Sequence, residues 1–337
     1  MKFDPRQKIY VICGTGALGD TCATFPTLKL LADRGHIEKM FVDDRYWDLY
    51  RLIFPAEIMV RLKEATTIIP REKITPDIPE SVINPRTGDA QFLNYPCLPG
   101  IPVIMTMDPT RLSPIHAHLV DSFSATIANC ILKEEEKDYP YIDEAYLDVN
   151  PVKVPKYVVI SYGSTTEHRK MLPEVFWELK EYFLARDYDV VLLGKRDHEL
   201  AVGGIELTRP KFDDLDKEGC LDLIDKTSIT ESLSVLHNAD LILGVDGGLI
   251  HLAGMTDTPI VAGFTTVDPY YRVIYRHGVR GWKFYPVEPD SECRYCQTST
   301  FCSFGIQFHI CNTRTKECML SLTSDKWIRQ IDRALED

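Results

Sequence analysis

Short apolar runs alternate with amphipathic stretches along most of this chain, and this alternation constrains the fold more than any other feature. Ile9–Cys13 is an apolar run that leads into a glycine-rich turn, and after the turn Phe25, Leu28 and Leu31 fall on one face of a helix. A chain in which strands and helices alternate forms a parallel sheet covered by helices. The sequence therefore predicts an α/β protein.

The same pattern predicts strands and helices in two groups. The expected strands cover residues 9–13, 39–42, 157–161, 189–193, 221–224, 241–245 and 260–264, and the expected helices cover 21–34, 173–186, 228–238 and 324–335. The strand at 260–264 is the last that the pattern indicates clearly. Residues 68–114 are rich in proline and give no assignment, and residues 108–128 are expected to be a loop that leads into a helix.

An acidic segment separates the two groups. Residues 133–148 contain seven acidic residues and two lysines, and Pro151 and Pro155 follow, which is typical of a solvated connector. A length of 337 residues suits two domains of about 150 residues each. We therefore expect an N-terminal domain over residues 1–150, a C-terminal domain over 151–322 and a closing helix over 323–337.

Charge and hydropathy argue against several classes of protein. The chain has 50 Asp and Glu residues against 38 Lys and Arg residues, and this net charge of −12 disfavours broad binding to nucleic acid or to membrane surfaces. No run approaches the ~18 consecutive apolar residues that a membrane helix needs. The apolar run at Ile9–Cys13 is also too short for a secretory signal. We therefore expect a cytoplasmic protein whose ten cysteines are normally reduced.

The turn after the first strand is the first candidate for chemistry. It reads Gly14-Thr-Gly16-Ala-Leu-Gly19-Asp20, and glycines allow the backbone to approach a ligand closely. Asp20 begins the following helix and has two interpretations. It is either a carboxylate that caps the helix or a general base that takes a proton from a hydroxyl group.

Two further strand ends carry hydroxyl and cationic side chains. Residues 162–170 read Tyr-Gly-Ser-Thr-Thr-Glu-His-Arg-Lys, which could cradle a diphosphate. Gly194-Lys195-Arg196 ends the next strand and could add charge to the same site. A polar loop and a solvent-facing turn are the alternatives.

Asp246-Gly247-Gly248-Leu-Ile-His251 is the most specific motif. The strand at 241–245 ends there and a helix begins, so that backbone N–H groups can face an anion. His251 lies about one turn into the helix, where either a packed histidine or a functional one would fit.

The last part of the chain holds a cationic aromatic stretch. Pro269–Val287 carries Arg272, Arg276, Arg280 and Lys283 among six aromatic residues and has no acidic residue. Such a stretch suits an acceptor or partner surface, and equally a partly buried aromatic loop.

Five cysteines crowd into the segment that follows, at Cys293, Cys296, Cys302, Cys311 and Cys318. The Cys-x2-Cys pair is typical of metal sites, and the later thiols could complete a tetrahedral site for structural zinc or iron. The spacing matches no common zinc finger, so reduced or partly disulfide-linked structural thiols are the alternative.

Taken in order, these motifs resemble glycosyltransferase family 9, the heptosyltransferase family of the GT-B fold. The segments that carry the resemblance are Leu18-Gly19-Asp20 with Pro26 and Leu28, Lys170-Met-Leu-Pro173 with Phe176 and Leu179, Leu192-Leu-Gly194 with Glu199, and Leu233–Ala253 with Asp246-Gly-Gly-Leu-Ile-His251 and then Pro259. The cysteine-bearing end around Cys318 is also similar to a segment of the family. The resemblance is thin between residues 50 and 150.

The resemblance implies two Rossmann-like domains that face a cleft, and transfer of a sugar from a nucleotide-sugar with inversion and without a catalytic cofactor or metal. Asp20 would then be the general base. The donor would be held by Gly16, Gly19, Ser164, Thr165, Thr166, Lys170, Gly194, Asp246, Gly247, Gly248 and His251. Gly247 departs from the family, which has Ser or Thr there, so that one hydroxyl contact is missing.

A heptose-type sugar and a glycan acceptor such as lipopolysaccharide core are expected from this resemblance. Transfer to a protein or to modified nucleic acid, or a catalytically silent GT-B scaffold, are the alternatives. A dehydrogenase built on the first glycine motif is disfavoured, because it would leave the later motifs unexplained. The sequence indicates no oligomeric state.

Overall fold

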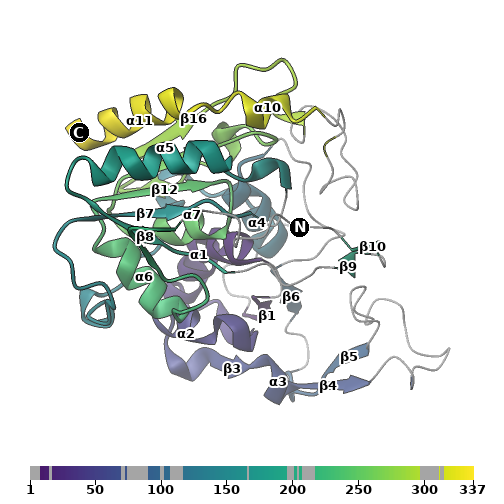
Figure 1. The fold of residues 1–337 in the computed structure, drawn as a ribbon. Coiled ribbons are helices and arrows are strands. Elements are labelled where there is room, and N and C mark those ends of the chain that lie inside the picture. Colours follow the sequence, from purple (N-terminus) through teal and green to yellow (C-terminus); the bar gives the residue numbers. More distant parts are fainter. Residues whose placement is uncertain are drawn as a thin grey trace.

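Two parallel β-sheets, one from each half of the chain, organise the fold (Figure 1). The computed structural model describes residues 8–14, 17–69, 73, 90–98, 102–106, 117–164, 167–195, 201–202, 205–206, 217–296, 311 and 315–337. The first sheet has the order β3-β2-β1-β6, from β1 (Ile9–Cys13), β2 (Ile37–Val42), β3 (Met59–Arg61) and β6 (Val103–Met105). The second has the order β11-β8-β7-β12-β13-β16, from β7 (Tyr157–Ser161), β8 (Asp189–Leu192), β11 (Cys220–Asp222), β12 (Leu241–Val245), β13 (Ile260–Gly263) and β16 (Phe284–Val287).

Every neighbouring pair of strands in the second sheet is parallel. Counted within that sheet, the order is 3-2-1-4-5-6, the order of a doubly wound nucleotide-binding fold. The direction of winding reverses between β7 and β12. Ligands of such sheets bind beyond the carboxyl ends of the strands at that reversal, so the turns after these two strands are the expected site.

Helices cover both faces of this sheet. The α-helices of the described ranges, in both halves of the chain, are α1 (Leu18–Asp33), α2 (Trp47–Arg51), α3 (Leu62–Ala65), α4 (Leu119–Ala128), α5 (Pro173–Leu184), α6 (Ile229–His237), α7 (Gly248–Ala253), α10 (Glu317–Leu320) and α11 (Ser324–Glu336). Figure 1 shows α5 and α11 side by side on one face of the second sheet, with α6, α7 and α1 beyond the other face. The predicted closing helix is therefore α11, which packs on α5 and on β13 and β16.

Strand β7 illustrates why both faces are covered. Tyr157 and Val159 belong to the core that continues into α1 and α4, whereas Val158 and Ile160 belong to the core under α5 and α11. Because side chains alternate along a strand, an apolar run without interruption needs cover on both sides. The first of these cores also contains residues of the first sheet, so it joins the two halves of the chain.

Short antiparallel pairs complete the described secondary structure. They are β4 (Thr66–Ile69) with β5 (Ala90–Leu93), β9 (Ala201–Val202) with β10 (Ile205–Glu206), and β14 (Tyr275–Arg276) with β15 (Val279–Arg280). None of the helices within the described ranges combines the length and the apolar character needed to cross a membrane.

The prediction that 260–264 is the last clear strand was wrong, because β16 follows at Phe284–Val287 and pairs with β13. Part of the stretch 269–287 therefore lies in the interior and not on an exposed binding surface, since Tyr275, Arg276 and Phe284 are buried. The apolar side chains of this stretch complete the sheet and its hairpin, which is the alternative that the sequence left open.

Candidate functional site

The first turns of α1 and α7 touch, and this contact brings two of the predicted motifs together. A Cβ atom on Gly19 would lie 2.8 Å from Cδ2 of His251. A Cβ atom on Gly248 would lie 2.9 Å from Cβ of Leu18 and 3.3 Å from the backbone nitrogen of Gly19. Glycine at both positions therefore permits an approach that any side chain would obstruct. Asp20, the next residue of α1, lies at the edge of this contact.

Two carboxylates and two guanidinium groups surround the contact. Arg169 Nη1 lies 3.0 Å from Asp246 Oδ2, and both side chains are largely buried. Arg272 interacts electrostatically with Asp246 and with Asp20. The turn after β12, the loop after β7 and the first turn of α1 therefore contribute to one charged cluster.

The cluster tunes the acid–base character of its members. Burial raises the pKa of the Asp20 carboxyl, the charges of Arg272 and Arg169 act against that rise, and the charge of Asp246 adds to it. Burial also lowers the pKa of the Arg272 guanidinium, and the nearby Asp246 opposes that change. A carboxylate whose pKa is raised is a stronger base and is better suited to accept a proton from a hydroxyl group.

His251 lies in the interior of the cluster as a neutral imidazole. Burial lowers its pKa to about 4, the charge of Asp246 opposes that effect, and Arg272 and Arg169 reinforce it. Its Nδ1 lies 3.0 Å from the hydroxyl of Tyr139, which comes from the connector between the two halves. At neutral pH this ring can donate one hydrogen bond and accept one, without carrying charge.

The loop after β7 brings its cations to the same edge of the sheet. Thr265 Oγ1 donates a hydrogen bond to the backbone oxygen of His168 (2.9 Å), and Arg169 Nε donates to Thr266 Oγ1 (3.1 Å). Lys170, one residue further on, is buried. The turn after β13 thus holds the loop, and the loop supplies positive charge opposite the two carboxylates.

Two of the remaining predicted donor-binding residues are described. Ser164 follows β7 and Gly194 follows β8, with the Cβ position of Gly194 4.0 Å from Leu249 of α7. The other predicted donor-binding residues Gly16, Thr165 and Thr166, and the candidate metal ligand Cys302, lie outside the described residues.

Gly247 has room that its neighbour lacks. A Cβ atom there would lie 3.4 Å from the backbone oxygen of Val245 and 4.0 Å from that of Gly163, which are ordinary contacts. Crowding therefore does not explain why this chain has glycine where the resembled family has Ser or Thr.

Sequence reasoning missed three members of the cluster. Arg169 was seen only as one of several cations in its loop, and Arg272 only as part of the aromatic stretch. Tyr139 lies in the acidic connector, where no motif marks it. The one available signal for Arg169 was its position beside Lys170 at the end of a central strand.

Four of the five late cysteines are described, and they interact with one another. Burial, with smaller contributions from the charges of Cys293, Cys296 and Cys311, raises the pKa of the Cys318 thiol to about 11. Within the described ranges, no three His, Cys, Asp or Glu side chains are placed to hold a metal ion.

A comparison with protein families gives this arrangement a context. Residues 123–280 match the model of glycosyltransferase family 9 (heptosyltransferase). The match covers just under half of the chain. The resemblance predicted from the sequence is thereby confirmed, and the matched stretch includes His251, Asp246, Arg169 and Arg272 of the cluster.

A curated relative matches over a shorter stretch. Lipooligosaccharide heptosyltransferase 2 of Haemophilus influenzae is 28% identical over 94 residues, which are 28% of this chain and 26% of the relative. The match thus spans about a quarter of that relative's length.

Several solved glycosyltransferase structures share the fold of this chain. The iron-containing dodecameric glycosyltransferase TibC of enterotoxigenic E. coli H10407 has a TM-score of 0.64 and 17% identity, and the match covers 100% of this chain and 80% of TibC. The ADP-heptose lipopolysaccharide heptosyltransferase II of E. coli has a TM-score of 0.60 and 15% identity, with 98% and 99% covered. E. coli heptosyltransferase WaaC with ADP has a TM-score of 0.55 and 15% identity, with 96% and 99% covered. The predicted GT-B fold of two Rossmann-like domains is confirmed.

Proposed function

We propose that this protein is an inverting glycosyltransferase that moves a sugar from a nucleotide-sugar to an acceptor hydroxyl group. The observation that carries the proposal is the convergence of Asp20 with Asp246 and His251, from two separate sheets, at the contact of α1 and α7. The family 9 match, and a TibC structure in complex with ADP-D-beta-D-heptose, support a nucleotide-sugar donor.

Asp20 is the proposed general base. Its carboxylate would take the proton of the acceptor hydroxyl while the oxygen of that group attacks the anomeric carbon from the face opposite the leaving diphosphate. Burial raises the pKa of this carboxyl, which makes its carboxylate more basic, and the charge of Arg272 acts against that rise. Inversion follows because attack and departure occur on opposite faces of one carbon.

The cations on the other side of the cluster are proposed to bind the diphosphate. Arg169 and Lys170 come from the loop after β7 together with Ser164, at the point where the sheet reverses its winding. Negative charge grows on the diphosphate as the glycosidic bond breaks. Fixed cations at that place lower the barrier without a metal ion at the reaction centre.

The two halves have separate parts in this proposal. Residues 1–150 would form the acceptor side and contribute Asp20, residues 151–322 would form the donor side, and 323–337 the closing helix. A heptose-type sugar is proposed because the relatives in the comparisons are heptosyltransferases, and a glycan such as lipopolysaccharide core is the proposed acceptor. A protein acceptor, a modified nucleic acid and a silent scaffold remain as alternatives. The expected cytoplasmic location stays a prediction, which cell fractionation would test.

The test is transfer activity in an Asp20→Ala variant, with ADP-heptose as the first donor. We expect transfer to be lost while the donor still raises the thermal stability of the variant, because a ligand of the folded state stabilises it. Asp33→Ala is the matched control on the same helix, since Asp33 is exposed and its partner in the described part of the chain is Lys29, four residues earlier. Turnover by Asp20→Ala at the wild-type rate would refute the proposed base. No stabilisation of wild-type protein by any nucleotide-sugar would favour the scaffold.

The cysteine segment is proposed to be a structural metal site for iron or zinc. Thiolates are the preferred ligands of both metals, and three thiols act electrostatically on Cys318. The segment also braces the donor side, because the backbone N–H of Tyr295 donates to the oxygen of Thr265 at 2.8 Å. Elemental analysis of purified protein is expected to give one metal ion per chain, and loss of that metal in Cys296→Ser. Metal-free protein of full stability would indicate structural thiols instead.

A further inference from the structure

Tyr139 comes from the connector, residues 133–148, and its hydroxyl group contacts His251 in the cluster. Its ring is fully buried, and within the described part of the chain the hydroxyl's hydrogen-bond partner is Nδ1 of His251, at 3.0 Å. The two rings are nearly parallel, with an interplanar angle of 20°. The connector therefore reaches into the proposed active site through this one side chain.

The contact fixes the tautomer of the histidine. Burial raises the pKa of the Tyr139 hydroxyl well above its usual value and lowers that of His251 to about 4, so the pair holds one phenolic proton and one imidazole proton. If the imidazole proton were on Nδ1, the buried O–H of Tyr139 would lose the acceptor that it has within the described residues. That imbalance favours the form with the proton on Nε2 by about 5- to 150-fold.

The opposite edge of the histidine ring faces α1. Cδ2 of His251 lies 2.8 Å from the position that a Cβ atom of Gly19 would take, and Nε2 is bonded to Cδ2. An N–H at Nε2 is therefore a hydrogen-bond donor towards the first turn of α1, where Asp20 follows Gly19 in the chain.

The backbone of Tyr139 is itself held from both sides. Its N–H donates to the oxygen of Tyr275 at 3.1 Å, and its carbonyl oxygen accepts from Nη1 of Arg276 at 3.1 Å. Arg276 is buried, and its Nε lies 2.7 Å from Oδ1 of Asp257. The hairpin of β14 and β15 thus fixes the position of the Tyr139 backbone relative to His251.

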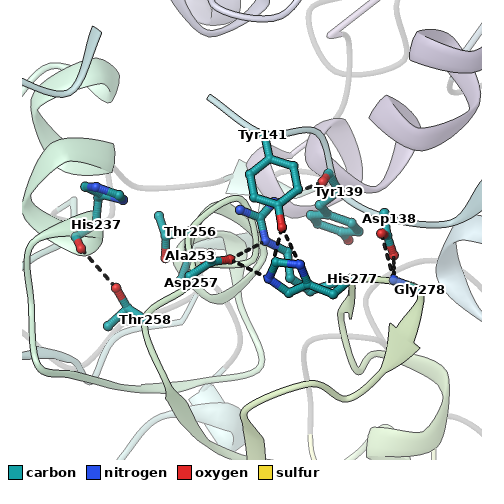
Figure 2. A network of polar contacts seen from close by, with 11 residues as sticks. Asp138, Tyr139, Tyr141, His237, Ala253, Thr256, Asp257, Thr258, His277 and Gly278 are labelled. Carbon is teal, nitrogen blue, oxygen red and sulfur yellow. Dashed lines mark hydrogen bonds and ion pairs between the residues drawn. The ribbon is translucent and has the colours of Figure 1, made fainter. Parts of the chain in front are cut away.

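Flanking contacts extend this attachment, as Figure 2 shows. The backbone N–H of Gly278 donates to both carboxylate oxygens of Asp138, at 2.8 and 2.9 Å. On the other side, the hydroxyl of Tyr141 meets the ring of His277, which in turn lies 3.1 Å from Asp257. Asp138, Tyr139 and Tyr141 are therefore each joined to the hairpin, and we call this set of contacts the connector–hairpin clasp.

We propose that Tyr139 is a positioning residue, which holds His251 in the Nε2–H tautomer and so presents a hydrogen-bond donor to substrate oxygens beside Asp20. The inference rests on the proposed function for its consequence in catalysis, but the tautomer itself is a property of the free protein. The role is separate from proton transfer, because neither ring gains or loses a proton during the reaction.

The direct test is NMR of the full chain with ¹⁵N-labelled histidine at neutral pH. A His251→Gln variant identifies the signals of this ring by their loss. We expect Nδ1 of His251 to show the shift of an unprotonated nitrogen in wild type, and a mixture of tautomers in Tyr139→Phe. Tyr157→Phe is the matched control, because Tyr157 is also buried and donates its hydroxyl to the oxygen of Val235 at 2.8 Å. It should leave the His251 signals in place.

Kinetics provide a second readout. Loss of one oriented donor predicts a fall of about ten-fold in kcat for Tyr139→Phe, with little change in the KM of the donor. A proton on Nδ1 in the wild type would overturn the proposal, as would an unchanged tautomer in Tyr139→Phe. Because the spectrum needs no turnover, it stands even if Asp20→Ala proves active and the proposed function fails.

Discussion

The crossing of α1 and α7 makes a sharp prediction for Gly248→Ala. The added methyl group would lie 2.9 Å from Cβ of Leu18 and 3.3 Å from the backbone nitrogen of Gly19. Neither atom can rotate away, since one is fixed to the backbone and the other belongs to it. The helices must therefore move apart, and Asp20 moves with α1.

The expected cost follows from two opposing effects. Overpacking of a close contact costs about 1–3 kcal/mol. Alanine returns up to about 1 kcal/mol of helix propensity, and less at the first residue of α7 than in a helix interior. The net loss is about 1–2 kcal/mol in the free energy of unfolding. Activity should fall further, because a displacement of about 1 Å at a catalytic group can cost about 100-fold in rate.

Urea unfolding followed by circular dichroism measures the stability, and transfer kinetics with the best donor measure the second effect. Gly247→Ser is the matched control, because its Cβ has only an ordinary 3.4 Å contact and Gly247 is the N-cap of α7, where serine is favoured. We expect this control to be neutral or slightly stabilising. A Gly248→Ala protein with the wild-type urea midpoint and rate would refute the argument from close helix approach.

Two further predictions concern charge. The pKa of His251 is about 4 in the folded protein and about 6.5 in the unfolded chain, so the unfolded chain binds this proton first on acidification. The free energy of unfolding should therefore fall as the pH drops from 6.5 to 4, and His251 contributes a slope of up to about 1.4 kcal/mol per pH unit. Chemical unfolding at several pH values should show that His251→Gln lacks this contribution. Asp257→Ala leaves the buried Arg276 without its carboxylate partner and should lower the free energy of unfolding, measured by thermal unfolding, by about 1–2 kcal/mol. The control Asp33→Ala removes an exposed ion pair and should cost less than about 0.5 kcal/mol. Equal losses in the two variants would show that the Asp257–Arg276 pair contributes no more than a surface ion pair.

The central strands were predictable from the sequence because they are buried on both faces, which favours an uninterrupted run of apolar residues. Tyr157–Ser161 and Leu241–Val245 are observed with the predicted bounds, and each is buried over its whole length. At the sheet edge the pattern fails. Phe284–Val287 contains Pro286, which lacks the N–H that a ladder uses and counts against a strand, yet β16 is an edge strand where proline is tolerated.

The candidate site divides in the same way. Asp20, Asp246 and His251 could be proposed because each follows the end of an apolar strand, and parallel strands end at one edge of a sheet. Tyr139 could not, because 112 positions separate it from His251 and nothing in an acidic connector distinguishes a buried tyrosine from an exposed one. Only the pairing of the connector with the hairpin creates that contact.

The connector–hairpin clasp also limits how the molecule can move or be divided. A fragment that begins at residue 151 would lose Asp138 and Tyr139, and with them the partners that these residues give to the oxygen of Tyr275, Nη1 of Arg276 and the N–H of Gly278. The segment that joins the halves is thus part of the wall of the site and not a loose tether. Any opening that separates α1 from α7 must bend the chain outside residues 138–141.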